Sequence, residues 1–263
     1  MTTQGRLETI SLREGSGVPL VLLHGFPLDH RMWSDVVASL PGEPTVVAVD
    51  LPGLGESPVG PEPASVEAAA DATADALAAA GITRAVVGGL SMGGYVALAL
   101  AERHPELVVG LGLVDTKSTA DTEEARANRL RVADAVTGSG TVDAVLGMPA
   151  ALLGATSKAV RPHLTARLEE WIRTQRPAGI AWSQRAMAAR PDRTDVLAGF
   201  PGPVAVVVGE EDTVTPVAEA EHMAAAASHA QLVVVPAAGH MSAVEEPAAV
   251  ADALGDLLAR ASA

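Results

Sequence analysis

The chain has no cysteine, and only 2% of its 263 residues are Phe, Trp or Tyr. The missing thiol excludes disulfides, thiolate metal sites and a cysteine nucleophile. With so few aromatic residues, the core must be built from Ala, Val and Leu. Hydrophobic residues make up 48% of the chain, which is ample for a folded domain. The available chemistry is therefore that of Ser, His, Asp, Glu, Lys and Tyr.

Basic residues are also scarce: 18 Lys and Arg stand against 32 Asp and Glu, a formal net charge of −14. Such a field repels nucleic acid and anionic lipid, so we expect neither as a partner. The uncharged run 85–101 is shorter than the roughly 20 residues of a spanning helix and is interrupted by glycines. The N-terminal residues include no apolar signal segment, which predicts a cytoplasmic protein.

Hydrophobic periodicity predicts an α/β fold. Residues 7–13 alternate in polarity, as expected for an antiparallel edge strand, whereas short continuous apolar runs predict strands buried on both faces. These runs are 18–23, 45–49, 85–87, 107–114, 204–208 and 232–235. Helical patterns lie between them, at 33–40, 66–80, 95–103, 217–227 and 243–260. The alternation predicts a mostly parallel sheet with helices on both faces.

One segment, residues 118–198, interrupts this alternation. It contains helical patterns such as 123–135 and 164–173 but no strand-like run. Structureless loops of that length are rare, so the segment predicts an inserted helical cap. The expected organisation is a core formed by residues 1–117 and 199–263, with the cap at 118–198.

The sequence Gly89-Leu-Ser91-Met-Gly93 places a serine between an apolar strand and a helix. A G-x-S-x-G turn is too sharp for neighbouring Cβ atoms, and it lifts the serine hydroxyl above the sheet. Ser91 is therefore the candidate nucleophile. The alternative is a glycine-rich turn that binds an anion.

With His24-Gly-Phe26-Pro27 and Asp50-Leu-Pro-Gly-Leu-Gly-Glu-Ser57 in the same order, the chain resembles the α/β-hydrolase family. It looks closest to small carboxylesterases and 3-oxoadipate enol-lactonase-like members. The resemblance implies that the backbone N–H groups of Phe26 and Met92 form an oxyanion hole. It also implies that Asp50 anchors a loop and is not a catalyst.

A serine nucleophile needs a base, and seven histidines are available. His240 follows the predicted strand 232–235, which places it at the carboxyl end of that strand. Gly239-His240, followed by Glu245 and Pro247, resembles the G-H-x-x-x-x-E-x-P ending of the family. We therefore expect His240 to be the general base.

The third member of a triad orients the imidazole. Asp212, in Gly209-Glu-Glu-Asp212 after strand 204–208, stands where the family usually has its acid. Glu210 and Glu211 are local alternatives, and Asp115 is another because some family members place the acid after the preceding strand. The order Ser91, Asp212, His240 is the one this fold uses.

The expected function is hydrolysis of a small to medium carboxylic ester or lactone through an acyl-enzyme, with no metal and no organic cofactor. Carbon–carbon hydrolysis, a cofactor-free perhydrolase and a triad-bearing ligand sensor remain alternatives. Candidate substrate-binding residues from both parts of the chain are Leu90, Met148, Trp171, Trp182 and Met187. For the Trp and Met side chains among them, packing in the core of the cap is the more common alternative.

Overall fold

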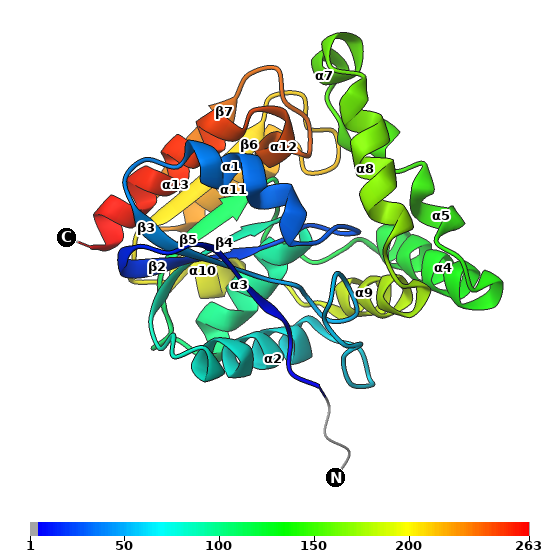
Figure 1. Cartoon of the computed structure of the whole chain (residues 1–263), viewed down its shortest axis with the longest axis horizontal. Helices are drawn as coiled ribbons and strands as arrows, with labels where there is room; N and C mark the ends of the chain where they lie inside the picture. Colours follow the sequence, from blue (N-terminus) through cyan, green and yellow to red (C-terminus); the bar gives the residue numbers. More distant parts are fainter. Residues whose placement is uncertain (1–4, 263) are drawn as a thin grey trace.

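The computed structural model describes residues 5–262, and its centre is a seven-stranded sheet with the order β1-β3-β2-β4-β5-β6-β7 (Figure 1). The strands are β1 (Thr9–Arg13), β2 (Ser16–Leu23), β3 (Pro44–Val49), β4 (Ala85–Leu90), β5 (Val108–Val114), β6 (Val204–Gly209) and β7 (Ala230–Val235). Strand β1 pairs antiparallel with β3, and every other pairing is parallel. The α/β fold with a mostly parallel sheet is confirmed.

The central strands are apolar throughout because they are covered on both faces. Every residue of β4 and of β6 is buried, as expected for strands between two helical layers. Strand β1 instead lies at the sheet edge with mixed burial, which explains its alternating sequence.

Helices cover both faces of the sheet (Figure 1). They are α1 (Ser34–Ser39), α2 (Val66–Ala79), α3 (Met92–Arg103), α11 (Val217–Ala226), α12 (Ser242–Glu245) and α13 (Pro247–Ala261), with a 3-10 turn at His30–Trp33. The predicted helix 243–260 is divided in two, because Pro247 begins a new helix at its first position. Helix α3 begins three residues earlier than predicted, at Met92, and therefore includes Gly93 and Gly94.

Two adjacent glycines of β4 show how closely the layers approach. A Cβ on Gly88 would contact Leu254 of α13, whereas a Cβ on Gly89 would meet the backbone of α3 at Gly93. Neighbouring residues of a strand point to opposite faces, so α13 and α3 cover opposite sides of the sheet. Gly112, the partner of Gly88 in β5, also faces Leu254, and its Cβ would lie 2.7 Å from the Leu254 Cδ2 atom.

Residues 118–198 are helical and contain no strand. The helices are α4 (Glu123–Ser139), α5 (Asp143–Leu146), α6 (Pro149–Leu152), α7 (Ala155–Val160), α8 (His163–Arg173), α9 (Pro177–Ala189) and α10 (Thr194–Ala198). Helices α4, α5, α7, α8 and α9 stand to one side of the sheet (Figure 1). Helix α10 instead packs on α3 and α11. We propose that 118–198 is a cap in which α10 returns the chain to the core.

None of the helices within residues 5–262 is long and apolar enough to cross a membrane.

The close approach of α13 predicts that Gly112→Ala destabilises the protein by about 1–3 kcal/mol, because the added methyl group overpacks against Leu254. Gly138→Ala, within α4, is the control, since a Cβ there meets nothing within 4 Å. Alanine is the better helix former, so this control should cost nothing or add about 0.5–1 kcal/mol. Urea unfolding measures both. Equal stability of the two variants would contradict the tight contact between β5 and α13.

Candidate active site

Ser91 lies at the sharp turn between β4 and α3. Its φ of 51° and ψ of −110° are unusual for a residue with a side chain. The Ser91 N–H donates to Val114 O at 2.9 Å, and the Thr116 hydroxyl donates to Ser91 O at 2.8 Å. The chain on both sides of the serine is thus fixed by β5 and the residues that follow it.

Glycines make this turn possible. A Cβ on Gly89 would lie 2.2 Å from Gly93 O, and a Cβ on Gly93 would lie 2.2 Å from Leu23 O. Neither position can hold a side chain without movement of the backbone. The G-x-S-x-G spacing therefore has a steric cause in this structure.

The structure brings together the three residues that the sequence nominated for a triad. His240 Nε2 is 2.9 Å from Ser91 Oγ, and His240 Nδ1 is 2.8 Å from Asp212 Oδ2. Asp212 follows β6 and His240 follows β7, so both come from loops at the carboxyl ends of neighbouring strands. The result is an unbroken chain of hydrogen bonds from carboxylate to hydroxyl.

The Asp212 carboxylate is buried but well provided with donors. Its Oδ1 accepts from the N–H groups of Val214 and Thr215 at 2.7 and 3.0 Å, and its Oδ2 accepts from the Thr215 hydroxyl at 2.8 Å. Burial opposes the charged form, but hydrogen bonds from His240 and Thr215, with the attraction of His240, hold the pKa of Asp212 below its usual value. Thr215 was not among the residues predicted from the sequence. An Asp followed two and three residues later by such donors is an Asx-type turn, which could have indicated it.

Asp115, the alternative acid, is occupied elsewhere. It is fully buried at the end of β5, and its carboxylate accepts from Gly209 N–H and from the N–H and hydroxyl of Ser242. Burial first, and then the nearby Asp212 charge, raise the pKa of Asp115 to about 7. The carboxylate that is hydrogen-bonded to the imidazole is that of Asp212.

The two glutamates beside Asp212 also lie apart from His240. Glu210 is exposed. Glu211 binds the N–H and the hydroxyl of Thr156, in the segment that follows α6.

The loop containing Phe26 lies beside the serine. A Cβ on Gly25 would lie 3.7 Å from Ser91 Cβ. The His24 ring accepts from Leu51 N–H at 2.9 Å, which ties this loop to the loop after β3. Met92 is the first residue of α3, where N–H groups have no acceptor within the helix. Both predicted oxyanion donors thus belong to segments next to Ser91.

Asp50 has the environment of a loop anchor. It is fully buried and accepts from the N–H and the ring of His30, and from Glu56 N–H. Its hydrogen bonds to His30 raise the pKa of that histidine.

The predicted substrate-binding residues occupy varied places. Leu90 is the last residue of β4 and is fully buried next to Gly25. Met148 precedes α6, and Trp171 of α8 lies beneath the Arg167 guanidinium, 4.6 Å from the ring centroid. Trp182 and Met187 of α9 are buried: the Trp182 indole donates to Pro61 O at 2.8 Å, and Met187 Sδ lies 3.3 Å from an Arg129 nitrogen. Substrate contact by these side chains stays a prediction.

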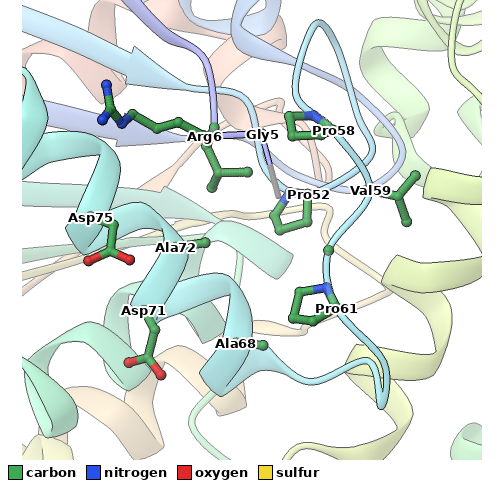
Figure 2. Close-up of a pocket in the computed structure, with 12 residues that line it drawn as sticks. Gly5, Arg6, Pro52, Pro58, Val59, Pro61, Ala68, Asp71, Ala72 and Asp75 are labelled. Carbon is green, nitrogen blue, oxygen red and sulfur yellow. The ribbon is translucent and has the colours of Figure 1, made fainter. Parts of the chain in front are cut away.

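A pocket of about 650 Å³, open to the surface, lies elsewhere on the molecule (Figure 2). Its walls are the N-terminal residues 5–7, prolines of the segment 52–61 and helix α2. The Asp71 carboxylate at its edge is already bound to Arg103 and His104. Ser91, Asp212 and His240 do not line this pocket.

A strained serine between a parallel strand and a helix, with a histidine from the last strand's loop within hydrogen-bond distance, defines an α/β-hydrolase architecture. The Alpha/beta hydrolase family matches residues 20–253, and the chain belongs to this family.

Named relatives and solved structures are similar over most of their lengths. A thermophilic esterase from Thermogutta terrifontis, solved with malate bound, is 37% identical with a TM-score of 0.92, covering 100% of this chain and 97% of its own. The enol-lactonase from Burkholderia xenovorans is 26% identical with a TM-score of 0.85, covering 96% of each chain. A pimeloyl-[acyl-carrier protein] methyl ester esterase of Neisseria meningitidis is 31% identical, covering 83% of this chain and 85% of its own.

The raised pKa of Asp115 predicts a pH-dependent effect of Asp115→Asn on stability. The folded protein binds the Asp115 proton more tightly than the unfolded chain does. Asp115 therefore makes its full contribution to the free energy of unfolding below the ordinary pKa of about 4. This contribution to stability is lost as pH rises through about 7. The free energy of unfolding of the Asn variant, relative to wild type, should therefore increase between about pH 4.5 and about pH 7.5 in urea titrations.

Asp134→Asn is the control for that comparison, because the Asp134 side chain is 80% exposed. Its difference from wild type should stay constant over the same range. A constant difference for Asp115→Asn as well would show that Asp115 ionises as readily in the folded protein as in the unfolded chain.

Proposed function

We propose that this protein hydrolyses a small to medium carboxylic ester or lactone through an acyl-enzyme, with Ser91 as nucleophile, His240 as general base and acid, and Asp212 as the residue that orients the imidazole. The supporting observation is the continuous hydrogen-bond chain, 2.9 Å from Ser91 Oγ to His240 Nε2 and 2.8 Å from His240 Nδ1 to Asp212 Oδ2. These distances lie within the range for nucleophile activation.

In the first half of the reaction, Ser91 Oγ attacks the carbonyl carbon while His240 Nε2 takes the hydroxyl proton. The resulting imidazolium is stabilised by the Asp212 carboxylate, which remains ionised. His240 then gives the proton to the leaving alkoxide, the carbon–oxygen bond of the ester breaks, and the acyl group stays on Ser91. In a lactone the same oxygen leaves but remains attached to the acyl chain.

Water completes the cycle. His240 removes a proton from the water as it attacks the acyl carbon, and returns that proton to Ser91 Oγ as the acid departs. The oxyanion of each tetrahedral intermediate would accept from the N–H groups of Phe26 and Met92. Each such donor is worth about 2.7–4 kcal/mol at the transition state.

The relatives support the ester and lactone class. They are named as an esterase, a methyl ester esterase and an enol-lactonase. A serine at position 91 favours acyl transfer, because the attacking oxygen becomes part of an ester that water can cleave.

The direct test combines three substitutions. Ser91→Ala should leave the fold intact and lower kcat by about 10⁴–10⁶, and Asp212→Asn by about 10⁴, since the triad acts as a unit. Asp115→Asn is the matched carboxylate control, and its effect on turnover should be far smaller because Asp115 is not bonded to His240. Hydrolysis of p-nitrophenyl acetate and circular dichroism provide the two measurements.

The possible outcomes separate the alternatives. Activity retained in Ser91→Ala would overturn the nucleophile, and a larger loss in Asp115→Asn than in Asp212→Asn would move the acid to β5. Stoichiometric fluorophosphonate labelling of Ser91 without turnover of esters or lactones would indicate a ligand sensor. Turnover confined to diketones, or to peroxide and a carboxylic acid, would indicate a carbon–carbon hydrolase or a perhydrolase.

The proposed cap limits the length of the acyl group that the site can accept. Each buried methylene adds about 0.8 kcal/mol, so kcat/KM for p-nitrophenyl esters should rise about fourfold per carbon until the roof is reached, and then collapse. The measurement is a series of p-nitrophenyl esters from acetate to octanoate in solution, with the palmitate ester supplied as an emulsion. Preference for emulsified long-chain esters would show that residues 118–198 behave as a lipase-type lid and not as a fixed roof.

A further inference from the structure

The backbone that carries His240 is held at three consecutive N–H groups. Gly239 N–H and Met241 N–H both donate to Glu245 Oε1, at 2.9 and 3.2 Å. Between them, His240 N–H donates to Leu152 O at 2.8 Å. One carboxylate oxygen and one carbonyl of the cap therefore fix the peptide units on either side of the base.

The second oxygen of Glu245 joins this loop to the proposed cap. Glu245 Oε2 accepts from Gly154 N–H at 2.9 Å, and the residue is 1% exposed. A Cβ on Gly239 would lie 2.3 Å from Gly154 N, so the two segments are in direct backbone contact. The stretch 152–156, here called the cap segment, is thus bound to the loop of the base.

The cap segment is also bound by the loop that carries Asp212. Glu211, next to Asp212, accepts from the N–H and the hydroxyl of Thr156. Two carboxylates hold the cap segment, but they differ in one respect. Glu245 also binds the amides that flank His240, whereas the side-chain hydrogen bonds of Glu211 go to Thr156.

A carboxylate suits this position because all three of its partners are donors. It offers two acceptor oxygens and no hydrogen, whereas an amide side chain would turn an NH₂ group toward an N–H. A buried N–H left without an acceptor costs about 1–3 kcal/mol, which the loop would avoid by shifting.

We propose that Glu245 is a positioning residue for His240: its carboxylate holds the base-bearing loop in reach of Ser91 and locks that loop to the cap segment. The inference rests on the proposed function, because it assigns His240 the role of base. One side chain then links the alignment of the imidazole to the position of the cap segment.

Glu245→Ala tests this role through the split between kcat and KM, because it removes the acceptor of both amides beside His240, whereas a glutamine oxygen can keep both and lose only Gly154 N–H. Misplacement of a catalytic group by about 1 Å can cost about 10²-fold, so kcat should fall by about 10- to 100-fold while KM stays near the wild-type value. The rate of Ser91 labelling by a fluorophosphonate should fall by the same factor, because it depends on the base and not on the cleavage of an acyl substrate. A purely structural role would lower the melting temperature without changing the labelling rate at 25 °C.

Glu211→Ala is the matched control. It weakens the anchor of the same cap segment without touching the amides beside His240. We expect KM to rise while kcat and the labelling rate stay close to wild type. Identical kinetic effects in the two variants, or an unchanged labelling rate in Glu245→Ala, would overturn the proposal.

Amide hydrogen exchange in the unmodified protein gives a second test that does not depend on how the variant folds. The N–H groups of Gly154, His240 and Met241 should be protected by one shared opening event and exchange with similar free energies. Much faster exchange at Gly154 would separate the cap segment from the loop and overturn the link.

The proposed function and this inference fail in different ways. An active Ser91→Ala variant would remove the catalytic assignment itself. An inactive Ser91→Ala variant beside a fully active Glu245→Ala variant would leave the catalytic assignment in place and remove only the positioning role.

Discussion

Everything at the candidate active site depends on one backbone conformation, the φ of 51° at Ser91. Holding a residue with a side chain in this conformation costs of order 1–3 kcal/mol, and the conformation persists only when its surroundings allow no alternative. Strand β5 binds the serine N–H through Val114 O, and Thr116 binds its carbonyl. Because Gly89 and Gly93 have no Cβ atom, α3 and the end of β2 pack against the turn at distances that exclude a side chain. This conformation directs the Ser91 hydroxyl toward the loops at the carboxyl ends of the strands.

Two buried aspartates near that edge show how environment separates similar groups. Asp212 receives donors from its own turn and from the imidazole, so its pKa is lowered despite burial. Asp115 has donors too, but full burial and the neighbouring Asp212 charge raise its pKa to about 7. Two carboxylates so close together cannot ionise with equal ease. The one bonded to His240 keeps its charge, and the other links the loops that follow β6 and β7 through Gly209 and Ser242.

The helical residues 118–198, which we propose to be a cap, are bonded to two of the loops that carry the candidate triad. Their segment 152–156 bonds to the loop of the base through Glu245 and to the loop of the acid through Glu211. Leu152 supplies the acceptor for the N–H of His240 itself. The segment is thus joined, at one short stretch, to the two loops that carry His240 and Asp212.

The sequence by itself determined the fold class, since buried parallel strands must be continuous apolar runs and their alternation with helices allows few arrangements. It also nominated Ser91, Asp212 and His240, because each follows a strand and the carboxyl ends of parallel strands meet at one edge. Only the tertiary structure decided between Asp212 and Asp115 as the partner of the imidazole, since that choice depends on the directions of two loops.

The tertiary structure likewise decided the roles of Thr215, Glu211 and Glu245, whose partners could not be inferred from the sequence. It also showed that Trp182 contacts Pro61 O and that Met187 contacts Arg129, which residue type alone could not indicate. The physical reason is the same throughout. Local pattern specifies which residues are buried and where strands end, but hydrogen bonds between distant loops depend on how those loops pack.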